Sequence, residues 1–284
     1  RYRPAYVHHL RAGLDKDGQI IAWENHIVGQ SIMDGGPFAS MVQNGVDPTS
    51  VEGSSTLPYA IPNLSVGLTS PKVGVPVLWW RAVGSTHTAY ATEVFLDEII
   101  DAVGADPVAY RLALLKDHPR HAAVLKLAAD KAGWGKPLPD GHSLGVSVHE
   151  SFNSYVAQVA EVSVDGTDIR VHRVVAAVDV GTAINPDTIR AQVEGGVGFG
   201  LGAILQEEIT LTEGEVDQGN YDSYLPLRME HMPKVEVHIM PSTESPTGVG
   251  EPGVPPIGPA VANAVFRATG RRIRTLPFSK GMTA

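Results

Sequence analysis

A predicted helix that is unusually rich in glycine constrains this fold more than any other feature of the chain. Asn185 and Pro186 mark its start, as an N-cap residue followed by a first-turn proline. The helix then carries glycine at positions 195, 196, 198, 200 and 202. Each glycine inside a helix costs about 1 kcal/mol relative to alanine, so another group is expected to approach the helix backbone closely. Two interpretations stay open: a bound phosphate-bearing cofactor, or close packing of the helix against a sheet.

Residue patterns predict strands and helices in both halves of the chain, and therefore an α+β fold. Alternating residues predict an N-terminal hairpin and later strands, at 6–14, 19–28, 145–148, 155–164, 169–180 and 234–239. Helical periodicity and capping residues predict further helices at 93–103, from Asp106 and Pro107 onward, at 119–132 and at 259–269. A short hairpin is expected around Glu213 and Gly214.

The segment between the first hairpin and the first helix shows little periodicity. Residues 33–76 are rich in Gly, Pro, Ser and Asn, which predicts a long segment made mainly of loops. Loops of this length usually take part in function or in an interface, and this segment is called the excursion below. A short buried strand is expected at 73–80. The 284 residues exceed the usual size of a single domain. We therefore expect two packed mixed α/β domains, 1–134 and 135–284, that meet near Gly135.

Composition excludes several classes of function. The net charge of -9 argues against a nucleic-acid or anionic-membrane surface, which needs a basic face. The chain has no cysteine, which excludes disulfides, thiolate nucleophiles and iron–sulfur ligation within it. No apolar run reaches the length of a membrane span. No P-loop, nucleophile elbow or zinc-protease motif is present, so hydrolase and nucleoside-triphosphatase functions have no positive support.

One carboxylate stands out in the C-terminal loop from Thr247 to Pro259. Glu251 is the single acid there, among four glycines and four prolines, just before a predicted helix. Proline stiffens such a loop and glycine leaves room beside it, so Glu251 is a candidate base held next to another molecule. A solvated turn glutamate explains the same pattern equally well.

The pattern around the other candidate residues indicates their function less clearly. Arg81 and Gly84 follow two tryptophans in WWRAVGSTH, where the guanidinium suits a substrate or phosphate but also an ordinary ion pair. A hydrolase with an unrecognised triad would need a nucleophile beside His87 or His149. Gln192, on the glycine-rich helix, offers both a donor and an acceptor to a heterocycle edge.

Three blocks of the sequence resemble the xanthine dehydrogenase and aldehyde oxidase family of molybdenum hydroxylases, and above all its isoquinoline 1-oxidoreductase branch. The blocks contain WWRAVGSTH, INPDTIRAQVEGG and TGVGEPGVPP. The resemblance implies that both domains are molybdopterin-binding regions, with the Glu251 loop in the second. The family places a base at the position of Glu251, which deprotonates a hydroxide on molybdenum as that oxygen attacks an electron-poor carbon.

The same resemblance implies roles for the remaining candidates. Arg81 and Gly84 would lie at the substrate pocket. The positions that would contact a molybdenum–pyranopterin cofactor, expected in its cytosine dinucleotide form, are Gln192, Gly195, Gly196, Gly198 and Gly250. Molybdenum itself would be held by the cofactor, without a protein ligand. Ala82 and Val83 differ from xanthine-oxidising members, which puts purine orientation in doubt.

Family large subunits carry an additional N-terminal half that is not recognisable here. The expected partners are therefore that half, a cysteine-rich 2Fe–2S small subunit, a cytochrome c acceptor and a small-molecule substrate. We expect a hydroxylase of N-heteroaromatic compounds or aldehydes with water as oxygen source, located in the periplasm by resemblance. The alternative is a non-catalytic fragment or scaffold that docks the N-terminal half and the iron–sulfur subunit.

Overall fold

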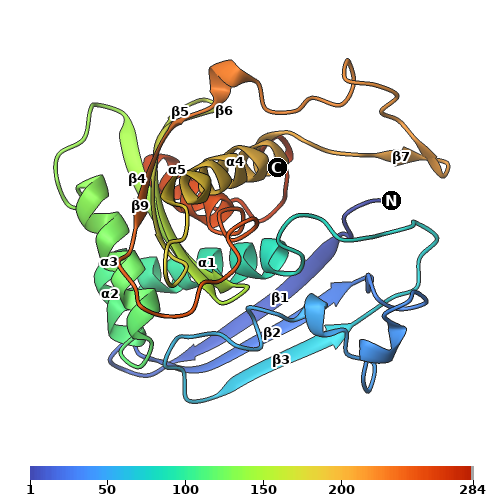
Figure 1. The fold of residues 1–284 in the computed structure, drawn as a ribbon, viewed down its shortest axis with the longest axis horizontal. Helices are drawn as coiled ribbons and strands as arrows, with labels where there is room; N and C mark the ends of the chain where they lie inside the picture. The colour runs from blue at the N-terminus through green and yellow to red at the C-terminus, as the bar shows by residue number, and fades with distance from the viewer. Residues whose placement is uncertain (283–284) are drawn as a thin grey trace. The chain divides into compact units, whose positions relative to one another are not determined.

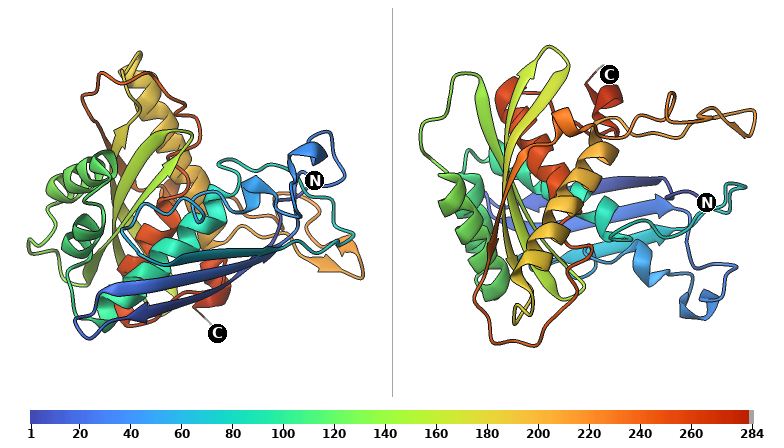
Figure 2. Two further views of the ribbon diagram at one scale, coloured as in Figure 1. Left: turned by 90° about the horizontal axis from the view of Figure 1, so that it is seen from below. Right: turned by 45° about the horizontal axis from the view of Figure 1, so that its top comes forward.

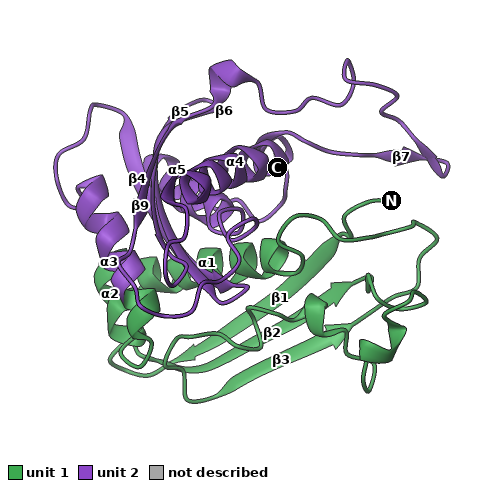
Figure 3. Ribbon diagram, in the orientation of Figure 1, with its two compact units in different colours: residues 1–122 green, residues 123–284 purple. Residues whose placement is uncertain are grey.

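A computed structural model describes residues 1–282 and divides the chain into two compact units (Figure 3). Unit 1 is Arg1–Ala122 and unit 2 is Ala123–Ala284. The division falls within helix α3 (Pro119–Ala132), whereas the sequence predicts a boundary between 134 and 135. None of the described helices combines the length and the apolar character that a membrane span needs.

Unit 1 is built on a three-stranded sheet in the order β1–β2–β3 (Figure 1). The predicted hairpin is confirmed: β1 (Tyr6–Leu14) pairs antiparallel with β2 (Ile20–Gly29). Its turn is closed by Asp15, whose carboxylate accepts hydrogen bonds from the N–H groups of Asp17 and Gln19, each at 2.9 Å. Gly18 supplies the positive φ that the turn requires.

The excursion from 33 to 76 is mainly loop, as predicted, but it contains a strand that the sequence analysis missed. β3 (Leu64–Thr69) runs parallel to β2, and two short 3-10 helices precede it, η1 (Ala39–Met41) and η2 (Pro48–Ser50). The strand predicted at 73–80 is wrong, because this segment makes only an isolated bridge between Tyr2 and Val77 and is mostly exposed. Its valines and tryptophans resemble a buried strand, but its proline at 76 has no N–H for a ladder.

Helices α1 (Ser85–Ala102) and α2 (Pro107–Leu114) complete unit 1. α1 begins eight residues before the predicted start at 93 (93 minus 85), because the polar residues of its first turns hide the helical period. Leu96 and Ile100 of α1 are fully buried, as is Ile27 of β2. The predicted cap of α2 is confirmed, since Asp106 accepts hydrogen bonds from two N–H groups of the first turn.

Unit 2 contains a four-stranded sheet in the order β4–β5–β6–β9. Its strands match the predicted segments and extend several of them: β4 (His142–Ser151), β5 (Ser154–Asp165), β6 (Asp168–Asp179) and β9 (Lys234–Ile239). The first three are antiparallel neighbours, and β9 runs parallel to β6. The predicted hairpin at Glu213 is also confirmed, as β7 (Leu211–Thr212) with β8 (Glu215–Val216). A 3-10 helix, η3 (Met229–His231), precedes β9.

Helices α4 (Pro186–Leu205) and α5 (Ile257–Thr269) cover one face of this sheet (Figure 2). α5 lies so close to β4 that a Cβ on Gly145 would come within 2.1 Å of the Ala260 carbonyl oxygen. α4 buries Ile189 and Val193 against Val156 of β5. A last short helix, α6 (Phe278–Gly281), was not predicted.

Candidate functional site

Glu251 lies on a loop that is fixed to the sheet of unit 2 by side-chain hydrogen bonds. This segment, residues 244–256, is called the Glu251 loop below. Gln158 donates from Nε2 to the Gly253 carbonyl oxygen at 2.8 Å, and Ser147 donates from Oγ to that of Pro256 at 2.6 Å. Ser154 donates from Oγ to the Gly248 carbonyl oxygen, also at 2.6 Å. The base predicted from sequence therefore sits on a segment with little freedom to move.

The backbone of the loop makes further bonds to its own turn and to β6. The N–H of Val254 donates to the Glu251 carbonyl oxygen at 2.9 Å, which closes a turn around the carboxylate. The N–H of Thr247 donates to the Val180 carbonyl oxygen at 2.9 Å, just beyond the end of β6. Glu251 itself is partly exposed, while the residues from 252 to 256 are buried.

The glycine-rich helix packs directly against this loop. A Cβ on Gly196 would lie 3.0–3.1 Å from the backbone of Gly253, and a Cβ on Gly200 would lie 2.5 Å from Cγ2 of Ile257. A Cβ on Gly198 would meet the sulfur of Met232 at 3.1 Å. Close packing therefore explains why positions 196 and 200 are glycine, and the cofactor contacts expected at Gly196 and Gly198 stay predictions.

A different part of the same helix is open. Gly195 and Gly250 are exposed, and the position of a Cβ on Gly250 would lie 3.9 Å from Oε1 of Gln192. The structure thus brings Gln192 and Gly250 together beside Glu251, and Gly195 follows Gln192 by about one turn of α4. These residues fit a flat heterocyclic cofactor, because glycine lets a ring approach the backbone and an amide matches both donors and acceptors.

The N-terminus of α4 does not favour the predicted phosphate. The Asn185 side chain already accepts a hydrogen bond from the Thr188 N–H at 3.0 Å. Asp187, in the first turn, adds a negative charge that would repel an anion there. Among the described residues, no group of three or more His, Asp or Glu side chains is arranged to hold a metal ion.

In unit 1, the candidate Arg81 is followed by a backbone conformation that is rare for its residues. Ala82 and Val83 have φ values of 75° and 50°, and the Val83 N–H donates to the Trp80 carbonyl oxygen. Left-handed geometry is costly for a β-branched residue such as valine, and such strain concentrates at functional sites. Arg81 is partly buried next to this turn.

Close packing explains why position 84, the other position predicted for the substrate pocket, is a glycine. A Cβ there would lie 1.7 Å from the Thr49 carbonyl oxygen. The N–H groups of Gly84 and Ser85 both donate to Oε1 of Glu52, at 2.7 and 3.1 Å. The carboxylate of Glu52 therefore caps the start of α1 and holds the turn that carries Arg81.

Neither histidine considered for hydrolase chemistry is hydrogen-bonded to a hydroxyl group of the described residues. His87 Nδ1 is 2.9 Å from Nε2 of His8, and its ring stacks on Tyr6 with centroids 3.6 Å apart. His149 is buried, and its Nε2 has no hydrogen-bond partner among the described residues. Burial lowers the pKa of His149 to about 4 and lowers that of His87 well below the usual range. Both side chains are therefore neutral near pH 7.

The sequence analysis missed the residues that hold the Glu251 loop. Ser147, Ser154 and Gln158 are fully buried on β4 and β5. The available signal was that polar residues recur on one face of each strand, at 147, 149 and 151 of β4 and at 154 and 158 of β5, and buried polar groups call for partners. The strained turn at Ala82 has no sequence signal of this kind.

Two family models match this chain, and both are described as a molybdopterin cofactor-binding domain. One covers residues 1–114 and the other covers residues 123–233. The chain belongs to the molybdenum hydroxylase family that includes xanthine dehydrogenases and aldehyde oxidoreductases, as predicted from its motifs.

Individual relatives agree with this assignment. The chain is 33% identical over 272 residues to the isoquinoline 1-oxidoreductase subunit beta of Brevundimonas diminuta, covering 94% of this chain and 35% of the relative. It is 33% identical over 220 residues to the membrane-bound aldehyde dehydrogenase (pyrroloquinoline-quinone) of Gluconacetobacter polyoxogenes, covering 70% of this chain and 28% of the relative. The chain thus spans about a third of the length of these relatives.

Solved structures of other proteins share the fold of this chain. Quinoline 2-oxidoreductase from Pseudomonas putida 86 superimposes with a TM-score of 0.75 at 14% sequence identity, over 96% of this chain and 60% of that one. This likeness confirms the predicted α+β fold of molybdenum hydroxylases.

Proposed function

We propose that this chain is the molybdopterin-binding part of a molybdenum hydroxylase in which Glu251 is the catalytic base. The substrate class is an N-heteroaromatic compound or an aldehyde. The observation that carries the proposal is the position of Glu251, on a fixed loop beside Gln192 and the exposed Gly195 and Gly250.

Each of these residues has a defined task in the proposed reaction. When bound, a molybdenum–pyranopterin cofactor supplies the two-electron oxidation, with water as the oxygen source. The carboxylate of Glu251 accepts the proton of the oxygen nucleophile as it attacks the electron-poor carbon of the substrate. The fixed loop keeps that carboxylate in place. Gln192 would hold the cofactor edge, and the exposed glycines would let it approach the backbone.

The proposed substrate contact in unit 1 is Arg81. Its guanidinium carries five N–H donors and stays charged, so it suits a ring nitrogen or a carbonyl oxygen of the substrate. The strained turn at Ala82 and Val83 and the cap by Glu52 support this role, because together they give the arginine a defined direction.

The proposed partners are those of a multi-subunit molybdenum hydroxylase. We place the electron-transfer centre on a 2Fe–2S subunit, with a cytochrome c as acceptor, which is compatible with the lack of cysteine in this sequence. The remainder of the large subunit, its N-terminal half, would complete the cofactor site. The cytosine dinucleotide form of the cofactor and a periplasmic location also belong to this proposal.

A second candidate function is a non-catalytic scaffold that docks the N-terminal half and the iron–sulfur subunit.

Elemental analysis of the natively purified protein, with every chain that accompanies it, separates the two candidates. The expected result is molybdenum together with iron, and cytidine monophosphate released on hydrolysis of the cofactor. Folded material that contains all partners, but neither metal nor nucleotide, would leave the scaffold as the better description.

A further inference from the structure

The Glu251 loop has few backbone N–H groups that can donate hydrogen bonds to its own carbonyl oxygens. Four of its residues are prolines, at 246, 252, 255 and 256, and proline has no N–H. A buried carbonyl without a donor costs about 1–3 kcal/mol. The buried carbonyl oxygens of Gly253 and Pro256 therefore depend on donors from elsewhere in unit 2.

Those donors come from one face of two neighbouring strands. Ser147 of β4 lies directly opposite Gln158 of β5, and Ser151 lies opposite Ser154. Residues directly opposite each other in a sheet point to the same face. Three of these polar side chains reach the loop, and all three have no measurable exposure (0%): Ser147, Ser154 and Gln158.

The direction of each hydrogen bond follows from the number of protons available. Ser154 has a single hydroxyl proton, which goes to the Gly248 carbonyl oxygen. Thr247 Oγ1, 2.7 Å from Ser154 Oγ, is then the donor of the second contact. The Oε1 atom of Gln158 has no partner among the described residues, so its amide is held by the bond to Gly253 alone.

We propose that Gln158, Ser147 and Ser154 are positioning residues for Glu251, which fix the loop on both sides of the carboxylate. Gly248 precedes Glu251 by three residues, and Gly253 and Pro256 follow it. This inference rests on the proposed role of Glu251 as base. The three donors act on carbonyl oxygens that flank Glu251 in the sequence, so losing one of them frees the loop on one side of the carboxylate.

The test compares two buried amides in unit 2. Gln158→Met keeps the length of the side chain and removes the donor to the loop. Asn263→Leu is the matched control, because Asn263 is also fully buried, and its Nδ2 donates to the Val146 carbonyl oxygen of β4, outside the loop. Ser147→Ala is a second loop variant, with a smaller change in volume, for use if Gln158→Met does not fold.

The readouts are hydrogen exchange of the peptide 244–256, molybdenum content, KM and kcat, all in the complete holoprotein. We expect Gln158→Met to accelerate exchange in that peptide and to lower kcat about tenfold to a hundredfold, with KM and molybdenum unchanged. Asn263→Leu should destabilise the fold without either effect.

Two failures are distinguishable. Unchanged exchange and unchanged kcat in both loop variants would overturn the positioning role, even if Glu251 is the base. Faster exchange with unchanged kcat, together with full turnover in Glu251→Gln, would overturn the proposed function and with it the catalytic purpose of these bonds.

Discussion

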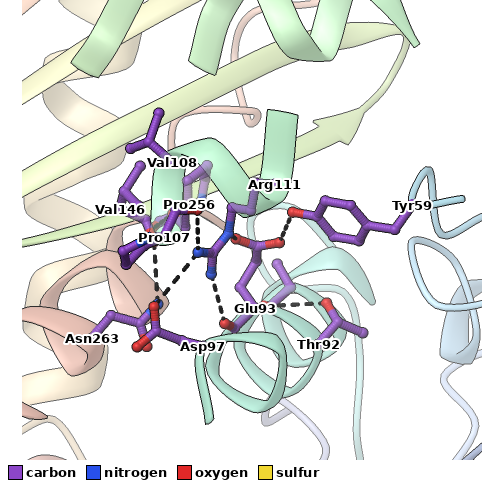
Figure 4. A network of polar contacts seen from close by, with 12 residues as sticks. Tyr59, Thr92, Glu93, Asp97, Pro107, Val108, Arg111, Val146, Pro256 and Asn263 are labelled. Atoms are coloured by element: carbon purple, nitrogen blue, oxygen red, sulfur yellow. Dashed lines mark hydrogen bonds and ion pairs between the residues drawn. The ribbon is translucent and has the colours of Figure 1, made fainter. Parts of the chain in front are cut away.

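Each unit of this chain buries a polar network, but the two networks differ in kind. In unit 1, Arg111 of α2 is fully buried and bonded through Nε to Glu93 at 3.0 Å, with Asp97 at 3.5 Å (Figure 4). Tyr59, from the long excursion, donates to the same Glu93 carboxylate. In unit 2, the donors to the Glu251 loop are neutral hydroxyl and amide groups.

The charged network of unit 1 holds the fold together, whereas the neutral donors of unit 2 hold the loop that carries the proposed base. One guanidinium with two carboxylates joins α1, α2 and the excursion, and no residue of this network was predicted to take part in catalysis. Buried charges are costly to desolvate, so this network is stable only while every member is present. Neutral donors carry a smaller desolvation cost, which suits a loop that, in the proposed function, presents the carboxylate of Glu251 to a ligand.

The charged network should be the most sensitive to substitution. Arg111→Met leaves Glu93 and Asp97 buried without their cation, so the free energy of unfolding is expected to fall by about 3–5 kcal/mol. Arg190→Met is the control, since its ion pair with Asp187 is exposed and should be worth at most about 1 kcal/mol. Urea titration measures both. Equal losses in the two variants would contradict the claim that burial makes the Arg111 network sensitive to the loss of one member.

The packing of α4 against the Glu251 loop gives the next largest effect. In Gly200→Ala, the new Cβ would lie 2.5 Å from Cγ2 of Ile257, and we expect a loss of about 1–3 kcal/mol. In Gly198→Ala, the new Cβ meets the flexible end of Met232, so the gain in helix propensity, at most about 1 kcal/mol, should prevail. Urea titration of both variants checks the opposite signs. A stabilising Gly200→Ala would refute close packing.

Protonation of His149 gives an effect that is small near neutral pH and develops as the pH falls. Its folded-state pKa is lowered to about 4 by burial, while the unfolded chain titrates near 6.5. Between these values the unfolded state binds more protons, so stability is fully present above about pH 6.5 and decreases as the pH falls toward 4. His149→Gln should flatten the fall of the unfolding free energy over this window by up to about 1.4 kcal/mol per pH unit. An unchanged slope in urea titrations at several pH values would mean that His149 is protonated in the fold.

Most of the fold was predictable because its elements carry local signals. The caps at Asp106 and Asn185 and the alternation in β5 and β6 placed those elements within a few residues. β3 escaped prediction, because a parallel edge strand of mixed polarity has no periodic signature. The segment at 73–80 was assigned wrongly, because its apolar residues resemble a strand, whereas Pro76 lacks the N–H that a strand ladder needs.

The candidate site was predictable only in part. The glycine and proline pattern around Glu251 pointed to a rigid loop, but it contained no sign of the donors on β4 and β5, which are about a hundred residues away in sequence. The glycines of α4 looked alike in the sequence. Only the structure separates Gly196 and Gly200, which pack against the protein, from the exposed Gly195.

The most direct test of the proposed function is the turnover of Glu251→Gln in the complete, cofactor-loaded protein. Glutamine keeps the shape of the side chain and removes its ability to accept a proton at neutral pH. With molybdenum content and loop exchange equal to those of the unmodified protein, we predict a fall in kcat of about a hundredfold or more. Near-normal turnover would contradict the assignment of Glu251 as the base.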